Sequence, residues 1–263
     1  MVSKNVTKLI QNLEKKKFRE KYNLFKIEGE KMVDELLRST FKIKYIFASE
    51  KWYSEHNNAI KNIETYTVTE SEMKSFSDFQ SLPQVLAIAE IPTSKSPLAK
   101  EIREELVILL NGVQDPGNLG TIFRVADWFG IKHIICDRNC ASIHNSKAVQ
   151  ASMGAIFRVN AIYIDNAEAW IEEHKTPYFK TFGTFLNGEN IYRTQLPPKG
   201  IIIMGNEGHG ISNELENLTD TKITIPSFAN SEFHTESLNV GVATGIILSE
   251  FKRGERGEVK GER

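Results

Sequence analysis

Apolar and polar positions along the first third of the chain predict helices and strands in turn. Apolar residues recur at helical spacing over 6–13 and 32–37, and short β-like runs follow at 44–49, 65–68 and 84–91. The polar stretches between these runs are long enough to form helices. This alternation predicts a small α/β layer domain.

A short segment, IPTSKSPLAK, has the composition of a linker, with two prolines and several small polar residues. We place the domain boundary within it, at residue 97. The expected organisation is a domain over 1–97, a second domain over 98–253 and a tail over 254–263. Because the tail is dense in charge, we expect it to be disordered.

After the linker the alternation resumes with stronger apolar runs. LVILL at 106–110 has the continuous apolar character of a strand that is buried on both faces. Further strands are predicted at 133–136, 160–164, 179–183, 201–205 and 222–226. Helices are predicted around 119–129, 145–153, 166–174, 212–218 and from residue 238 onward. Strands that alternate with helices predict a mainly parallel sheet, which binds its ligands at the carboxyl ends of the strands.

Composition narrows the class of protein. The chain is 40% hydrophobic and 25% charged, which is ordinary for a globular protein. No apolar run approaches the roughly 20 residues of a membrane helix, and the N-terminus lacks the apolar core of a secretory signal. Cys136 and Cys140 are too few for a disulfide framework or a structural zinc site. We therefore expect a cytoplasmic protein with two reduced thiols and no metal.

The net charge of −1 argues against a nucleic-acid partner, but the charge is uneven. Residues 1–31 hold nine lysines and arginines against four glutamates. A clustered basic face binds phosphates even when the whole protein is neutral. Such a run is also common on solvated helices, so by itself it gives only weak support for RNA or DNA binding.

Three segments concentrate Gly, Asn, Glu and Ser where a strand gives way to a helix. In the first, NGVQDPGNLGTIFRVADWFG (111–130), a turn leads to Asn118, and the helix that follows carries Arg124. Asparagine is a good helix cap, so a structural role for Asn118 is as reasonable as a functional one. Arg124 has apolar neighbours, and an arginine on the buried side of a helix needs a carboxylate or phosphate partner.

The second segment, IIIMGNEGHGIS (201–212), runs from a buried strand into a glycine-rich loop that contains Glu207 and His209. Its glycines allow backbone amides to approach a ligand closely. The segment lacks the Lys-Ser/Thr ending of a phosphate-binding P-loop and the features of the dinucleotide-binding fingerprint. We interpret His209 as a surface residue.

The third segment, IPSFANSEFHTESLNVGVATG (225–245), places Ser237 and Asn239 at the start of the last predicted helix. Gly241 and Gly245 are small enough to let this helix approach another backbone closely. Any one of the three segments fits many α/β enzymes. Their occurrence in this order is far more specific.

In this order, DP-x-N-x-G-x₃-R, M-G-N-E-G-x-G-I-S and I-P…S-L-N-V-x-V-A-x-G-I resemble the three signature blocks of the SpoU (TrmH-type) RNA 2′-O-ribose methyltransferases of the SPOUT superfamily. The resemblance covers 106–253 closely. Residues 1–97 more loosely resemble the L30e-like substrate-binding domain of members that act on ribosomal RNA. The resemblance implies an enzyme that uses S-adenosylmethionine to methylate a ribose 2′-hydroxyl in structured RNA, with ribosomal RNA favoured over transfer RNA.

The same resemblance implies further properties. The expected fold is an L30e-like αβα domain followed by a mainly parallel α/β domain with a C-terminal trefoil knot, and the expected assembly is a homodimer without membrane or metal. Two departures from the family pattern stand out: the stretch 228–236 is longer and more polar than in some members, and Val85 follows Gln84 where many members have glycine.

Site residues are assigned by matching the motifs. The positions implied as catalytic are Arg124, Asn118, Glu207, Ser237 and Asn239. The positions implied to bind the cofactor are Thr181, Gly183, Thr184, Gly205, Asn206, Glu207, Gly208, Ile225, Pro226, Ser227, Leu238 and Asn239. Arg124 either removes the hydroxyl proton with help from the nucleotide's phosphate, or stays charged, clamps that phosphate and stabilises the oxyanion. Because arginine stays protonated in proteins, we favour the second role.

Three other classes of protein remain open. A non-catalytic RNA-binding relative is disfavoured because Arg124, Glu207 and Asn239 are all present. A nucleotide-dependent enzyme such as a dehydrogenase is disfavoured because no GxGxxG follows the first strand. A methyltransferase that modifies a base nitrogen is disfavoured because the block with Asn118 and Arg124 is associated with ribose acceptors.

Overall fold

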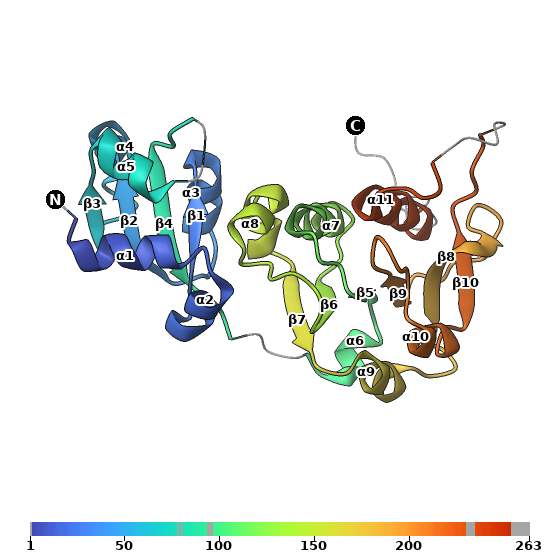
Figure 1. Cartoon of the computed structure of the whole chain (residues 1–263). Coiled ribbons are helices and arrows are strands. Elements are labelled where there is room, and N and C mark those ends of the chain that lie inside the picture. The colour runs from blue at the N-terminus through green and yellow to red at the C-terminus, as the bar shows by residue number, and fades with distance from the viewer. Residues whose placement is uncertain (1, 78, 80, 94–96, 230–234, 254–263) are drawn as a thin grey trace, which may run out of the picture. The chain divides into compact units, whose positions relative to one another are not determined.

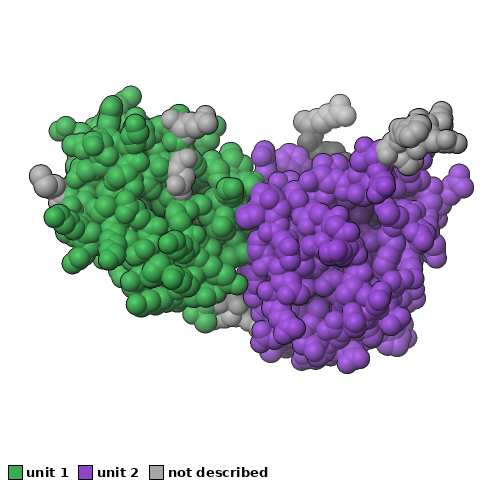
Figure 2. Space-filling view, viewed as in Figure 1, with its two compact units in different colours: residues 1–93, 142–158 green, residues 94–141, 159–263 purple. Residues whose placement is uncertain are grey.

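The structure is a computed structural model that describes residues 2–77, 79, 81–93, 97–229 and 235–253. The chain forms two compact units (Figure 2): one comprises 1–93 and 142–158, the other 94–141 and 159–263. Residues 142–158 therefore belong with the first unit, although the sequence division placed them in the second domain. The tail over 254–263, expected to be disordered, lies outside the described residues.

The first unit contains a four-stranded sheet in the order β1-β4-β2-β3 (Figure 1). Its strands are β1 (Leu24–Glu28), β2 (Ile43–Ala48), β3 (Thr65–Thr67) and β4 (Val85–Glu90). β4 runs antiparallel to both β1 and β2, while β3 runs parallel to β2. Its helices are α1 (Lys4–Asn12), α2 (Lys16–Tyr22), α3 (Glu30–Leu37), α4 (Glu50–His56), α5 (Glu70–Phe76), α8 (Ser146–Ser152) and the 3-10 turn η1 (Ala155–Phe157). The three strands predicted in this region are confirmed.

Strand β1 was not predicted, because its apolar residues alternate with two charged ones. All five of its residues are buried, Lys26 and Glu28 included. The Lys26 ammonium lies 2.5 Å from Glu14 Oε1 and 2.7 Å from Glu28 Oε1, and it donates to the carbonyl of Phe76 at 3.0 Å. Burial lowers the pKa of Lys26, but the hydrogen bonds to the two carboxylates outweigh it and leave the pKa above its usual value. Paired charges thus allow a charged sequence to form a buried strand.

His144 is half-buried in the first unit, with its ring against the edge of Phe25 at 4.8 Å between centroids. Burial, and secondly the charge of Arg19, lower the pKa of His144 from 6.5 to about 4. The folded protein therefore holds this imidazole neutral under conditions in which the unfolded chain protonates it.

We expect acidification to destabilise the protein through His144. Between pH 6.5 and about 4, His144 is protonated in the unfolded chain but neutral in the folded protein. The free energy of unfolding should therefore fall by roughly 2–3 kcal/mol over this range because of His144. Denaturant titrations at several pH values measure the loss. His144→Gln should remove this part of the pH dependence, and an identical pH profile for the variant and the native chain would contradict the prediction.

The second unit contains a six-stranded sheet in the order β10-β8-β9-β5-β6-β7. Every pairing in it is parallel, as the alternation of strands and helices predicts. Its strands are β5 (Leu106–Leu110), β6 (His133–Asp137), β7 (Asn160–Ile164), β8 (Thr181–Asn190), β9 (Gly200–Met204) and β10 (Thr221–Thr224). Its helices are α6 (Ala99–Ile102), α7 (Pro116–Trp128), α9 (Ala167–His174), α10 (Asn213–Asn217) and α11 (Val240–Phe251). The predicted fold class, α/β with a mainly parallel sheet, is confirmed.

Strand β8 extends well past the predicted end at Gly183. Gly183 pairs with Lys222, whereas the next residue of β10, Ile223, pairs with Glu189, so residues 184–188 leave the ladder. Two hydrogen bonds fix the segment 184–188. Thr184 Oγ1 donates to the carbonyl of Ile203 at 3.0 Å, and Thr224 Oγ1 donates to the carbonyl of Leu186 at 3.1 Å. The polar sequence of this second half hid the strand.

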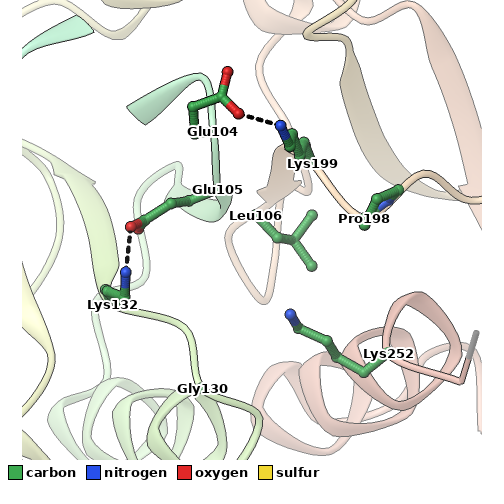
Figure 3. Close-up of a pocket in the computed structure, with 8 residues that line it drawn as sticks. All are labelled: Glu104, Glu105, Leu106, Gly130, Lys132, Pro198, Lys199 and Lys252. Atoms are coloured by element: carbon green, nitrogen blue, oxygen red, sulfur yellow. Dashed lines mark hydrogen bonds and ion pairs between the residues drawn. The ribbon is translucent and has the colours of Figure 1, made fainter. Parts of the chain in front are cut away.

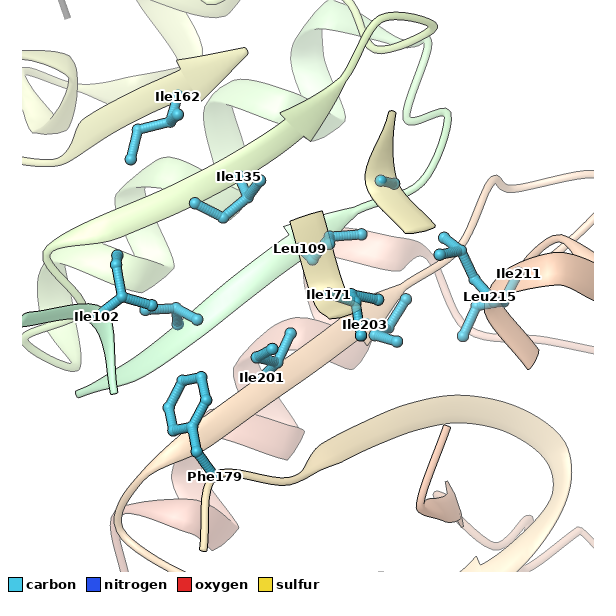
Figure 4. Close-up of a cluster of buried hydrophobic side chains, with 12 residues drawn as sticks. Ile102, Leu109, Ile135, Ile162, Ile171, Phe179, Ile201, Ile203, Ile211 and Leu215 are labelled. Atoms are coloured by element: carbon cyan, nitrogen blue, oxygen red, sulfur yellow. The ribbon is translucent and has the colours of Figure 1, made fainter. Parts of the chain in front are cut away.

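A cluster of buried side chains on the sheet of the second unit forms its core (Figure 4). The members come from strands β5, β6, β7 and β9, from helices α6, α9 and α10, and from two loop positions: Ile102, Val107, Leu109, Ile135, Ile162, Ala167, Ile171, Phe179, Ile201, Ile203, Ile211 and Leu215. Isoleucine predominates, since β-branched side chains pack well on a pleated surface.

Removing one methyl group from this core should measurably weaken the fold. Ile203 is fully buried, so we expect Ile203→Val to lower the free energy of unfolding by about 1 kcal/mol. Denaturant titration measures the change. Leu98→Ala is a suitable control because Leu98 is 58% exposed, and its effect should stay within about 0.5 kcal/mol. Equal losses in the two variants would contradict this account of the core.

Helices α7 and α11 pack against each other, and small residues make their close approach possible. A Cβ atom on Gly241 would lie 2.8 Å from Thr121 Cγ2, and one on Gly245 would lie 3.8 Å from Val125 Cγ1. The glycines of α11 thus serve contacts within the chain. Packing of the two helices brings the first and third sequence motifs together.

In the described ranges no helix combines the length and the apolar character needed to cross a membrane. Cys136 and Cys140 are free and buried. A hydrogen bond with Cys140, together with burial, raises the pKa of Cys136 well above its usual value, which keeps this thiol protonated and unreactive.

Candidate active site

The site begins at the N-terminus of α7, which follows β5 directly. Asp115 caps this helix, with Oδ1 accepting the amide of Asn118 at 2.7 Å, and Pro116 occupies the first turn. Asp115, and not Asn118, is therefore the helix cap. The side chain of Asn118 is left available for another contact.

A chain of hydrogen bonds links the three sequence motifs. Asn118 Nδ2 donates to Glu207 Oε1 at 2.8 Å, and Asn239 Nδ2 donates to Asn118 Oδ1 at 2.8 Å. Oδ1 of Asn239 at the same time caps α11 by accepting the amides of Gly241 at 2.9 Å and Val242 at 3.3 Å. One residue from each motif thus meets the others at the carboxyl edge of the sheet, as the strand order requires.

Asn206 shapes the glycine-rich loop. Its Nδ2 donates to the carbonyl of Gly112 at 2.7 Å, and its Oδ1 accepts the amides of Gly208 at 2.8 Å and His209 at 3.1 Å. Two backbone hydrogen bonds of 2.9 Å pair Asn206 with Gly210. The loop is therefore a closed hairpin, and His209 is exposed on it, as predicted.

Close packing within the chain accounts for two glycines that the sequence assigned to cofactor binding. A Cβ atom on Gly205 would lie 2.3 Å from the carbonyl carbon of Gly210, and one on Gly183 would lie 2.6 Å from Phe185 Cε2. Each glycine permits contact between parts of this protein, whether or not a ligand is bound.

Sequence reasoning missed two residues that support the loop. Asn111 Oδ1 accepts the amide of Ser212 at 2.8 Å, and Asn111 Nδ2 donates to Asp137 Oδ2 at 2.8 Å. Asn111 is the first residue after β5, and Asp137 ends β6 and is only 5% exposed. The signal available in the sequence was an aspartate, Asp137, directly after the strand predicted at 133–136.

Thr181 does not reach the carboxyl edge. It pairs with Ile201 at the beginning of β9 and is fully buried. Its hydroxyl donates to the carbonyl of Leu218 at 2.8 Å and lies 3.0 Å from Asp220 Oδ2, and its amide donates to the same carboxylate oxygen at 2.8 Å. The motif match placed Thr181 with the cofactor-binding residues, but the structure places it at the opposite edge in a structural role.

The segments around β10 and α11 supply the remaining predicted positions. Ile225, Pro226 and Ser227 directly follow β10, and Ser237 and Leu238 directly precede Asn239. Leu238 is 49% exposed, and Ser237 has no hydrogen-bond partner among the residues that the structure describes. The polar stretch 228–236 noted in the sequence lies partly outside those residues.

Arg124 lies on α7, six residues after Asn118. The expectation that its apolar neighbours place it on the buried side of the helix is wrong, because Arg124 is exposed. It forms no hydrogen bond or ion pair with any other described residue. The neighbouring apolar residues face the core, while Arg124 projects from the opposite side with its guanidinium available to an external anion.

A cavity of about 350 Å³ lies elsewhere in the second unit (Figure 3). It is lined at the amino ends of β5 and β9 by Glu104, Glu105, Leu106, Gly130, Lys132, Pro198, Lys199 and Lys252. Lys132 pairs with Glu105 at 2.6 Å, and Lys199 pairs with Glu104. The cavity is at the opposite edge of the sheet from the linked motifs, and its lining includes none of Asn118, Glu207 and Asn239.

Metal ligands are not assembled in the part of the chain that the structure describes. No three His, Cys, Asp or Glu side chains come close enough together there to hold a metal ion. The side chains that link the motifs are the amides of Asn118 and Asn239 and the carboxylate of Glu207.

Comparison with known families identifies the class of protein. The SpoU rRNA Methylase family matches residues 105–249, and the MRM3-like substrate binding domain matches residues 4–87. The first match spans more than half of the chain and includes all three linked motifs. The chain belongs to the SpoU rRNA methylase family.

Individual relatives agree with this assignment. The chain is 30% identical over 239 residues, 90% of its length and 92% of the relative's, to 23S rRNA (guanosine(2553)-2′-O)-methyltransferase RlmP of Bacillus subtilis. It is 32% identical over 149 residues, 56% of its length and 58% of the relative's, to 23S rRNA (guanosine-2′-O-)-methyltransferase RlmB of Neisseria meningitidis. The crystal structure of an AdoMet-bound rRNA methyltransferase from Sinorhizobium meliloti is 27% identical and superposes with a TM-score of 0.83, over 97% of each chain.

Proposed function

We propose that this protein transfers the methyl group of S-adenosylmethionine to a ribose 2′-hydroxyl in structured RNA, and that its substrate is ribosomal RNA. The observation that carries the proposal is the hydrogen-bonded chain of Glu207, Asn118 and Asn239, which joins the three family motifs at one edge of the sheet. The names of RlmP and RlmB, both 23S rRNA 2′-O-methyltransferases, support the acceptor and the substrate class.

The loops at the carboxyl edge fit an adenosyl cofactor. Such a ligand needs apolar surface for its base and nearby backbone groups for its polar atoms. Leu186 and Leu238 are 71% and 49% exposed, and Leu186 is fixed beside the end of β10 by Thr224. We assign the binding of the cofactor to the loops 183–188, 205–208 and 225–227 together with Leu238 and Asn239. When bound, the cofactor supplies an electrophilic methyl group.

Arg124 is proposed to hold the RNA and to stabilise the reaction. Its guanidinium stays charged, grips a phosphate of the target nucleotide through two parallel hydrogen bonds and stabilises the negative charge that develops on the 2′-oxygen. Its exposure and its lack of a partner among the described residues support this role. A fixed phosphate also orients the ribose for in-line attack, which supplies much of the acceleration.

The other predicted catalytic positions are proposed to prepare the site. Glu207 and Asn239 hold the amide of Asn118 in one orientation, so that the start of α7 faces the ribose in a fixed geometry. Ser237, which is exposed two residues before Asn239, is assigned to the RNA phosphate. These assignments give each motif a separate task.

We also propose the finer features of the fold that the family resemblance implies. Residues 1–97 are assigned an L30e-like fold, and the second unit is assigned a trefoil knot near its C-terminus. The order of the sheet supports the knot, since β10 lies at one edge while α11, next in the chain, packs on α7. An experimental structure traced continuously through residues 225–240 tests it.

A homodimer in the cytoplasm, working without a metal, completes the proposal. Trp128 on α7 and Val242 on α11 are 82% and 53% exposed, and they offer apolar surface to a partner subunit on the two helices that carry the first and third motifs. Analytical ultracentrifugation of the native chain and of Trp128→Glu tests the dimer. A native chain that sediments as a monomer at micromolar concentration contradicts it.

The experiment that tests the reaction uses methyl-labelled S-adenosylmethionine and unmodified total RNA from the organism that encodes the chain. Label is expected in an alkali-resistant dinucleotide, because a 2′-O-methyl group blocks cleavage at that position. Sizing the labelled RNA separates ribosomal from transfer RNA. Cofactor binding without any labelled RNA, either free or in ribosomal precursor particles, would favour a non-catalytic RNA-binding protein.

A further inference from the structure

Charged residues are divided unevenly among the helices of the first unit. α1 and α2 together carry six basic residues against Glu20 alone, a net charge of +5. α3, α4 and α5 carry seven acidic residues against three lysines, a net charge of −4. The positive charge is therefore concentrated on α1, α2 and the three residues that join them (Figure 1).

This charge is not neutralised within the protein. Of the two acidic residues in the region, Glu14 pairs with the buried Lys26 and Glu20 pairs with Lys16. Five exposed lysines form no ion pair with any described residue: Lys4, Lys8, Lys15, Lys17 and Lys21. Since they repel one another, an external polyanion is their natural partner.

Two aromatic rings lie among these lysines on α2. Phe18 and Tyr22 are stacked, with their centroids 6.1 Å apart and an angle of 9° between their planes. Lys17 Nζ lies 5.0 Å from the centre of the Phe18 ring, and Lys21 Nζ lies 5.5 Å from that of Tyr22. Tyr22 is 40% exposed. Phe18 is half-buried beneath it. Ammonium groups around an exposed ring are typical of surfaces that bind unpaired nucleotides.

We propose that the surface made of Lys4, Lys8, Lys15, Lys17, Lys21 and Tyr22, which we call the lysine–tyrosine face, binds ribosomal RNA. The lysines contact successive phosphates, and the ring of Tyr22 stacks on one unpaired base. The proposal rests on the proposed function and names the part of the first unit that holds the substrate. It assigns no such role to α3, α4 or α5.

The phosphate contacts are tested with Lys15→Gln/Lys17→Gln/Lys21→Gln. Binding to an in vitro transcript of the encoding organism's 23S ribosomal RNA is measured at several salt concentrations. Loss of three phosphate contacts should lower the slope of log Kd against log salt by about 2, and weaken binding on the order of a hundredfold near 0.1 M salt. Lys31→Gln/Lys51→Gln/Lys74→Gln removes the same charge from α3, α4 and α5 and should leave the slope unchanged.

The stacking contact is tested separately with Tyr22. Tyr22→Ala should weaken RNA binding by about tenfold, while Tyr22→Phe should bind like the native chain because the ring is kept. Tyr53→Ala is the matched control, because Tyr53 on α4 is also 40% exposed. Loss of affinity in Tyr22→Phe as well as Tyr22→Ala would show that the hydroxyl, and not stacking, makes the contact.

The outcomes separate this proposal from the proposed function. A native chain that binds S-adenosylmethionine but never methylates RNA refutes the function, whatever the lysine variants do. A native chain that methylates RNA, beside a triple variant with the native Kd and salt slope, refutes the lysine–tyrosine face. Weakened binding to a ribosomal precursor particle, with binding to the naked transcript unchanged, also refutes it and points to a protein contact.

Discussion

Arg124→Ala should lower the rate of methyl transfer to RNA by about 10²- to 10³-fold while leaving S-adenosylmethionine binding unchanged. The guanidinium is exposed and has no partner among the described residues, so its removal leaves no buried group unpaired and should not disturb the fold. The loss has the size expected when a charged group that stabilises a developing oxyanion is removed. Single-turnover rates with saturating RNA measure it.

Two further variants define the role of Arg124. Arg124→Lys keeps the charge but loses the paired hydrogen bonds to phosphate, so its rate should fall between those of the native chain and the alanine variant. Arg138→Ala removes an exposed arginine elsewhere in the second unit and should retain the native rate. A native rate in Arg124→Ala, with cofactor and RNA both bound, would remove Arg124 from the reaction.

Gly205→Ala should abolish cofactor binding and lower the free energy of unfolding by at least about 3 kcal/mol. The added Cβ atom would lie 2.3 Å from the carbonyl carbon of Gly210 and 2.5 Å from the amide nitrogen of Ile211. Both are backbone atoms that cannot rotate away, so the hairpin closed by Asn206 and Gly210 must open. Calorimetric titration with S-adenosylmethionine and thermal unfolding measure the two effects.

Gly208 provides a matched control in the same loop. A Cβ atom there would meet nothing closer than Asn206 Oδ1 at 3.5 Å, which is ordinary contact. Gly208→Ala should therefore keep the native stability to within about 0.5 kcal/mol. If Gly205→Ala were as stable as Gly208→Ala, the hairpin would not be the rigid element that its packing indicates.

The architecture of the second unit was largely predictable from hydrophobic pattern. Its central strands are short, continuous apolar runs such as 106–110 and 201–205. A strand that is buried on both faces needs apolar side chains at consecutive positions, so the pattern is easy to recognise. The motifs were assigned to one site by their resemblance to the family's signature blocks. The structure gives a physical reason for the contact among Asn118, Glu207 and Asn239, since residues that follow parallel strands meet at one edge of the sheet.

Other features depend on contacts that a linear pattern does not contain. β1 is buried although two of its five residues are charged, because Glu14 supplies a partner from another part of the chain. Thr181 was assigned to the cofactor by a motif match, but its register against Ile201 places it at the wrong edge. The exposure of Arg124 depends on its angular position on α7. The apolar residues on both sides of it in the sequence do not reveal that position.

Asn239 makes the start of α11 a reporter for the site. The side chain of Asn239 accepts hydrogen bonds from the amides of Gly241 and Val242 and donates one to Asn118. Fraying of the first turn of α11 and loss of the alignment of Asn118 therefore occur together. The exchange of those two amide protons with solvent therefore reads out the integrity of the linked motifs without any turnover. A ligand that binds to the loops should slow the exchange of these two amide protons, and the degree of slowing reports the fraction of protein that is occupied by the ligand.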